Sequence, residues 1–131
     1  MNTWVLLARI VGTFAAGNWL LRRREQQMAK ARGGYGFEDF VAHFSRERIP
    51  EDNLRHVYDY FRNWQSAKNF PVHPNDDLYQ VYGIVDDDLD DAMIEMAERW
   101  RAKLPAGFDG LRPVRTVADV VHLLHELPRE Y

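Results

Sequence analysis

The sequence predicts an all-α protein of one domain with an N-terminal appendage, and three observations support this fold class. Apolar residues recur at spacings of three and four in several segments, which is the period of amphipathic helices. No segment alternates polar and apolar residues for long enough to indicate a strand. The chain has 131 residues and no cysteine, so it supports one modest core and excludes disulfides and thiolate metal sites.

The N-terminal segment is the most apolar part of the chain. From Trp4 to Leu21 it is interrupted only by Arg9, Thr13 and Asn18, and three arginines follow directly. A helix of this length extends about 27 Å, enough to cross a thin bilayer core with its carboxyl side in the cytoplasm. Against a span, an arginine near mid-bilayer costs about 2.5–3.5 kcal/mol. Three interpretations stay open: a membrane anchor, an interfacial amphipathic helix, or a helix docked on a soluble core.

The first two interpretations assign the same side chains to the membrane. These membrane-facing residues are Trp4, Leu7, Val11, Phe14, Trp19, Arg22, Arg23 and Arg24. A secretory signal is not indicated, because no basic segment precedes the apolar stretch. We expect a cytoplasmic protein, with residues 4–21 as a candidate tether to the cytoplasmic face of the inner membrane.

The remaining chain divides into a linker and a helical domain. Residues 1–30 form the hydrophobic helix with its basic flank, the glycine-rich residues 31–36 form a linker, and residues 37–131 form the domain. The first helix of the domain has apolar residues at Phe37, Phe40, Val41 and Phe44. A second helix begins at Pro50 and continues to about residue 66. Its apolar face comprises Leu54, Val57, Tyr58, Phe61 and either Trp64 or Gln65.

A loop over residues 68–77 separates these helices from two more, because prolines three positions apart preclude a regular helix. The next helix follows an acidic start, and its predicted buried stripe is Leu89, Ala92, Met93, Met96, Ala97 and Trp100. Residues 103–113 are irregular, with a single turn expected around residues 108–111. Thr116 and Asp119 resemble a capping box that opens the last helix. The apolar residues of that helix are Val117, Val120, Val121, Leu124 and Leu127.

The net charge of −3 conceals a segregated distribution of charge. Residues 1–32 hold six basic residues and one acid, whereas residues 76–98 hold nine acids and no base. This segregation predicts a basic partner for the acidic segment. Nucleic acid is not expected as a partner, because the basic run is short and lacks interleaved aromatic residues.

Five aspartates lie within residues 86–91, and they do not form a calcium loop. Asp86, Asp88 and Asp90 match the first EF-hand positions, but Asp91 replaces the required glycine and Ala97 the required glutamate. Acids at a helix start are worth about 0.3–1 kcal/mol each, which accounts for one or two of them. The excess predicts a docking surface for a basic protein. We assign this surface to Asp86, Asp87, Asp88, Asp90, Asp91, Glu95 and Glu98.

No set of side chains in the sequence indicates catalysis or a metal site. His122 and His125 lie three positions apart without a third ligand at a recognised spacing. The only serines, Ser45 and Ser66, lack the glycines of a nucleophile elbow. We therefore expect a protein that is not an enzyme and that holds no cofactor and no metal.

The order of elements over about residues 48–127 resembles the acyl carrier protein fold. The run DLYQVYGIVDDD at residues 77–88 is similar to the motif D-L-Y-x-D-L-G-I-x-G-D-D. That motif belongs to a bacterial family of acyl-carrier-like proteins of unknown function that lack the phosphopantetheine serine. The resemblance implies a four-helix bundle, preceded here by the hydrophobic helix, whose acidic second helix docks on basic patches of partner enzymes.

The departures from the carrier pattern bear on function. The carrier motif Asp-Ser-Leu aligns with residues 87–89, so Asp88 stands where the serine would carry phosphopantetheine, and residues 67–115 contain no serine or threonine. Val81, Tyr82 and Asp86 also replace an aspartate, a leucine and a glycine of the loop. The resemblance thus implies a non-catalytic adaptor or regulatory protein for a basic enzyme of fatty-acid or lipid metabolism. The alternative is a true acyl carrier protein that is modified at an unexpected residue.

Overall fold

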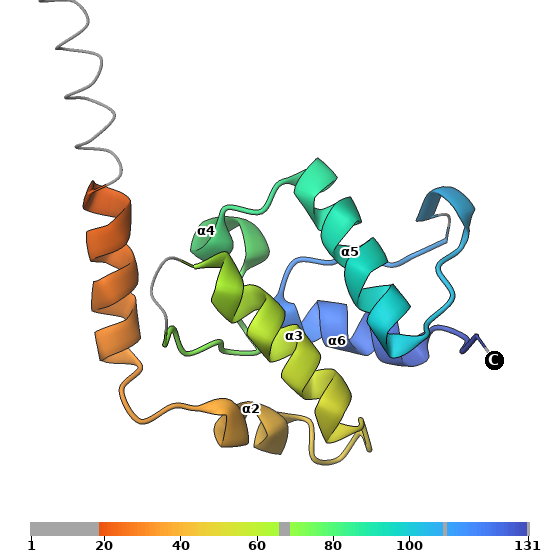
Figure 1. The fold of residues 1–131 in the computed structure, drawn as a ribbon, viewed down its shortest axis with the longest axis horizontal. Coiled ribbons are helices and arrows are strands. Elements are labelled where there is room, and N and C mark those ends of the chain that lie inside the picture. The colour runs from red at the N-terminus through yellow and green to blue at the C-terminus, as the bar shows by residue number, and fades with distance from the viewer. Residues whose placement is uncertain (1–18, 66–68, 109, 131) are drawn as a thin grey trace, which may run out of the picture.

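The all-α class is confirmed for the part of the chain that the computed structural model describes, which is residues 19–65, 69–108 and 110–130. Within these ranges the only β features are two isolated bridges, Asp77 with Thr116 and Ala102 with Arg129. The helix of residues 19–31, called the N-terminal helix below, stands beside the rest of the molecule (Figure 1, orange). The helices that follow are α2 (Phe37–His43), α3 (Glu51–Trp64), α4 (Leu78–Tyr82), α5 (Asp86–Trp100) and α6 (Val117–Glu126), with a 3₁₀ helix at Ala106–Phe108.

The apolar faces that the periodicity predicts form much of the core, and Phe70, Val72, Leu78, Tyr82 and Ile84 from the segment between α3 and α5 add to it. α3 packs against α2 and α5, and α5 packs against α6. In α5 every residue of the predicted stripe is buried except Leu89, which is half-buried. Of the two candidates for the buried position at the end of α3, Gln65 is the buried one. Its Nε2 donates to the Val81 carbonyl at 2.9 Å. Trp64 remains 40% exposed.

Helix α4 follows the predicted loop of residues 68–77 and was not predicted from the sequence, but the residues at its two ends explain why it forms. The Asp77 carboxylate accepts hydrogen bonds from the backbone N–H groups of Tyr79 and Gln80, at 3.0 and 2.9 Å. Gly83 closes the helix in the left-handed conformation, with φ of 68°. Five residues are too few for a helical period to show in the sequence. The 3₁₀ helix likewise begins two residues before the turn expected at residues 108–111.

The predicted capping box of α6 is confirmed. The Asp119 N–H donates to Thr116 Oγ1 at 3.2 Å, and the Thr116 N–H donates to Asp119 Oδ2 at 3.0 Å. The Asp119 carboxylate also accepts from the Arg115 N–H at 3.0 Å. Burial raises the pKa of Asp119, but these hydrogen bonds outweigh it, so the net pKa lies below the ordinary value of 3.8.

We expect Asp119→Asn to reduce the acid sensitivity of folding. Because the pKa of Asp119 is lowered in the folded state, its contribution is fully present above the unfolded pKa, near 3.8, and is lost as the pH falls through the folded value. Loss of the carboxylate also weakens the cap, at a cost of about 0.5–2 kcal/mol at neutral pH. Urea unfolding at pH 7 and at pH 3 measures both effects. Equal acid sensitivity of the variant and the wild type would contradict the assignment.

The segment predicted as a linker is tied to the domain by a buried carboxylate. Asp76 is 4% exposed, and both terminal nitrogens of the Arg32 guanidinium contact its oxygens, one of them at 2.8 Å. The Tyr82 hydroxyl and the His73 N–H donate to the same carboxylate at 2.8 and 3.0 Å. Arg32 also donates to the Pro71 carbonyl at 2.9 Å. These five residues, named the Asp76 network, hold the carboxyl end of the N-terminal helix on the loop before α4.

The network explains two pKa shifts. Burial and then the charge of Asp76 raise the pKa of Tyr82 far above its usual range, so its hydroxyl stays protonated and acts as a donor. Burial alone would lower the pKa of Arg32, but the hydrogen bonds and charge of Asp76 raise it overall. Arg32 and Asp76 thus form an ion pair that joins two distant segments of the chain.

The predictions for the N-terminal segment divide between described and undescribed residues. Trp4, Leu7, Val11 and Phe14 lie outside the described residues. Trp19 and the three arginines Arg22, Arg23 and Arg24 are exposed, as are Leu20 and Leu21. Among the helices of the described ranges, none combines the length and the apolar character that a membrane span needs.

Candidate docking surface on α5

The acidic residues of α5 occupy the first turn of the helix and its exposed face. Asp86, Asp87 and Asp88 form the first turn, and the residue at the N-cap is Val85, whose side chain makes no capping hydrogen bond. The aspartates therefore lie at the positive end of the helix dipole, but none of them occupies the N-cap position, from which a side chain would accept hydrogen bonds from the free N–H groups. Capping explains still less of the cluster than the sequence suggested.

We expect Val85→Ser to stabilise the protein. The backbone at Val85 is extended, with φ of −104° and ψ of 173°, as a side-chain cap requires. A serine hydroxyl there can accept from the N–H two or three residues on, a gain of about 1 kcal/mol, and half of the valine is already exposed. Thermal melting followed by circular dichroism should show an increase of a few °C. Val85→Ala is the control, since it removes the same methyl groups without supplying an acceptor, and an equal rise in both variants would contradict the capping account.

The predicted docking residues lie together on one exposed helix face. Asp88 is half-buried, and the other six are exposed, namely Asp86, Asp87, Asp90, Asp91, Glu95 and Glu98. Within the described ranges none of these acids forms an ion pair with a basic side chain. Their negative charge is therefore accessible to solvent or to a partner.

An exposed isoleucine lies at the centre of this acidic face, and the sequence analysis did not single it out. Ile94 is 52% exposed and follows Asp90 and Asp91 by one helical turn, with Glu98 one turn further on. Ile94 is an apolar residue outside the buried stripe of α5. This exception to the periodic pattern is the sequence signal that could have identified it. An apolar centre with a charged rim is the composition of a protein interface.

The field of the acids reaches the neighbouring helix. The pKa of Tyr60 on α3 is raised, first by burial and then by the charges of Glu95, Asp91 and Asp88. At the other end of α5, burial lowers the pKa of His56, and the charge of Arg99 adds to this effect. The acidic character of the face is thus strongest over the first three turns of α5.

A hollow of about 280 Å³ lies at the start of α5, and Asp88 is not among the residues that line it. The apolar residues that line it are Leu78, Ile84, Val85, Leu89 and Val114. The charged residues that line it are Asp77, Asp86 and Arg115. Its only hydroxyl is the phenol of Tyr79, since no serine or threonine lines it. No side chain of this hollow is an ordinary acceptor for a phosphopantetheine group.

The two histidines of the last helix do not come together as a site. His122 Nε2 lies 2.8 Å from Glu47 Oε1, an exposed contact between α6 and the loop after α2. His125 is half-buried, and its Nδ1 has no hydrogen-bond partner among the described residues. Across the ranges that the structure describes, no group of three or more metal-binding side chains is assembled.

Comparison with known proteins gives no relative for this arrangement. No family model, no curated protein and no solved structure matches the chain.

Proposed function

We propose that the protein is a non-catalytic, acyl-carrier-like adaptor that docks a basic partner protein through α5. The observation that carries the proposal is the acidic face itself: six exposed acids without an ion pair among the described residues, arranged around the exposed Ile94. Electrostatic complementarity of this kind speeds and orients association, and an apolar centre supplies affinity once water is excluded.

The order of the elements supports the carrier-like part of the proposal. The long helix α3 is followed by a proline-containing loop with α4 at its end. The acid-led helix α5, the short 3₁₀ helix and the capped closing helix α6 come next. The four-helix bundle of acyl carriers would consist of α3, α5, the 3₁₀ helix and α6. The aspartate at position 88 and the lack of a serine or threonine beside it support an adaptor without a phosphopantetheine arm.

The partner in this proposal is a basic protein, for which an enzyme of fatty-acid or lipid metabolism is the candidate class, and the cytoplasmic face of the membrane is the proposed location. The exposed Trp19, Leu20 and Leu21, followed by three exposed arginines, support contact with an anionic membrane surface. The remainder of the proposed tether, residues 4–18, lies outside the described ranges.

We expect charge reversal on α5 to abolish partner capture without unfolding the protein. The double variant Asp87→Lys and Asp90→Lys replaces attraction by repulsion at the centre of the face, and at least a tenfold loss of capture is expected. Capture is measured separately from membrane and cytosolic extracts, at low and high salt, because screening should weaken a charge-driven contact.

The matched control is Glu51→Lys with Asp52→Lys. These acids are exposed in the first turn of α3, so the control makes the same change of net charge and also removes acids from a helix start. If the control lowers capture as much as the α5 variant does, net charge rather than the α5 face determines binding. Unchanged capture by the α5 variant at unchanged helical content would refute the proposed docking surface.

The alternative of a true carrier is tested independently. Incubation with a phosphopantetheinyl transferase and coenzyme A, followed by intact mass measurement, should leave the mass unchanged because the hollow at the start of α5 offers no serine or threonine. A gain of one phosphopantetheine group would overturn the adaptor proposal.

A further inference from the structure

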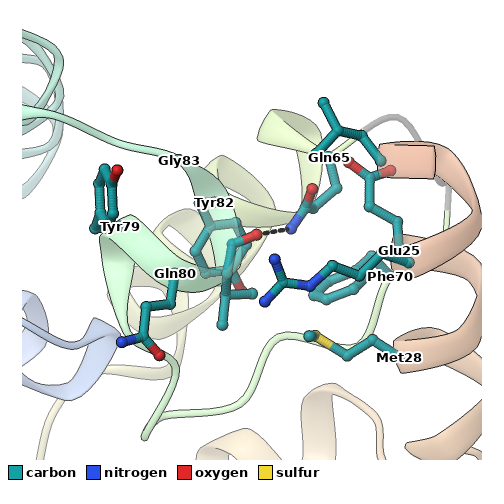
Figure 2. A pocket seen from close by; sticks show the side chains of 11 residues that line it. Glu25, Met28, Gln65, Phe70, Tyr79, Gln80, Tyr82 and Gly83 are labelled. Carbon is teal, nitrogen blue, oxygen red and sulfur yellow. Dashed lines mark hydrogen bonds between the residues drawn. The ribbon is translucent and has the colours of Figure 1, made fainter. Parts of the chain in front are cut away.

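A second cavity, of about 570 Å³, lies between the N-terminal helix and α4 (Figure 2). Met28 and Glu25 reach it from the N-terminal helix, while Tyr82 and Gln80 reach it from α4, and Phe70 lies between the two sides. Its volume is in the range of small-molecule sites, about 300–1,000 Å³. It involves none of the acidic residues of α5, and the inference below does not depend on the proposed docking function.

The inner wall of the cavity is largely buried and mainly apolar. Phe70 is fully buried, Tyr82 is buried, and Met28 and Val81 are half-buried. The polar groups of this wall are already bonded, since Gln65 Nε2 donates to the Val81 carbonyl at 2.9 Å and the Tyr82 hydroxyl donates to Asp76. A ligand would therefore meet carbon and sulfur along this side.

The outer part of the cavity carries one charge of each sign. Arg24 and Glu25 both line it, and Arg24 has no ion pair among the described residues. The helix of residues 19–31 carries three arginines and one lysine against this single acid, and α4 carries no charged residue. Arg24 would thus attract an anionic group of a ligand. That group would lie at the exposed end of the apolar site.

We propose that this cavity binds a single-chain amphiphile with an anionic head group. The alkyl chain lies along Met28, Phe70 and Val81, and Arg24 pairs with the head. A carboxylate of a free fatty acid and the phosphate of a lysophospholipid share this chemistry. The Asp76 network fixes the site, because Tyr82 forms part of the wall and Arg32 holds the helix that forms the other side.

The test measures binding of three probes to the whole 131-residue chain by isothermal titration calorimetry. The probes are a fatty acid below its critical micelle concentration, an anionic lysophospholipid of the same chain length, and vesicles of anionic diacyl phospholipid. We expect one-to-one binding of at least one single-chain probe, affinity that rises with chain length, and a shifted methyl resonance of Met28 on binding. A fatty alcohol of the same length should bind about tenfold more weakly or worse, since it lacks the charge.

Two arginine variants separate the cavity from the general charge of the helix. Arg24→Ala should weaken single-chain binding at least tenfold, whereas Arg22→Ala removes the same charge from the same helix at a residue that does not line the cavity. Equal losses in both variants, binding to vesicles alone, or an unshifted Met28 methyl would overturn the proposal. Binding of the fatty acid but not the lysophospholipid, or the reverse, supports it and identifies the source of the ligand.

Discussion

Replacement of Asp76 by alanine is expected to lower the free energy of unfolding by about 3–5 kcal/mol, which is the usual cost of breaking a buried ion pair from one side. Among the described residues, the substitution leaves the half-buried Arg32 guanidinium with the Pro71 carbonyl as its one hydrogen-bond acceptor, beside its contact with the Phe70 ring. It also leaves the Tyr82 hydroxyl and the His73 N–H without this acceptor. Urea unfolding followed by circular dichroism measures the loss. Hydrogen exchange should show that protection disappears first in residues 19–31, because the N-terminal helix is held there by Arg32.

An exposed ion pair provides the control for this experiment. Arg112 and Glu126 form a contact of 3.1 Å in which both side chains are about half exposed. Glu126→Ala should therefore cost less than about 1 kcal/mol. If Asp76→Ala costs no more than Glu126→Ala, the buried network does not stabilise the fold and does not hold the N-terminal helix in place.

The second large effect is expected at Phe61, where alanine should cost about 3–5 kcal/mol. Phe61 is fully buried on α3 and packs on Tyr82 with a ring-centroid distance of 5.3 Å, so its removal opens a cavity between α3 and α4. The neighbouring Tyr60 ring lies 5.5 Å away and cannot turn inward without leaving its own contact with Trp64. Chemical denaturation reports the loss as a lower midpoint at an unchanged slope.

Trp64→Ala on the same helix is the matched comparison for Phe61→Ala. Trp64 is the larger side chain but is 40% exposed, and we expect a cost of about 1 kcal/mol or less. Equal destabilisation by the two substitutions would mean that Phe61 is not part of the packed interior.

The long helices were predictable because each repeats its apolar residues over three or more turns. α5 and α6 begin within a few residues of where the acidic start and the capping box place them. The acidic face was predictable for the same reason, since the buried stripe of α5 leaves only one side for Asp87, Asp90 and Asp91. The exposed Ile94 was missed because the periodic pattern was used to find the core and not to find exceptions to it.

The contacts between distant segments were not predictable from spacing. Arg32 and Asp76 are 44 positions apart, and nothing local marks either as a partner of the other. Arg32 follows a run of similar basic residues, and Asp76 precedes a run of similar acids, so burial alone distinguishes the pair. The cavity beside α4 was not predictable either, because its lining residues come from the segments 21–28, 65–70 and 79–83, which are separate in the sequence.

The loop before α4 also bonds directly to the beginning of α6, and this has a consequence for folding during synthesis. The Val117 N–H donates to the Asp76 carbonyl at 3.1 Å and the Ala118 N–H to the Pro74 carbonyl at 2.8 Å. Pro74 and Asp76 therefore find these backbone partners only after residues 117 and 118 have left the ribosome. Phe70 and Val72, which are buried on the same loop, would remain uncovered until then. We therefore expect a nascent chain that ends before α6 to leave the loop of residues 69–77 without these partners.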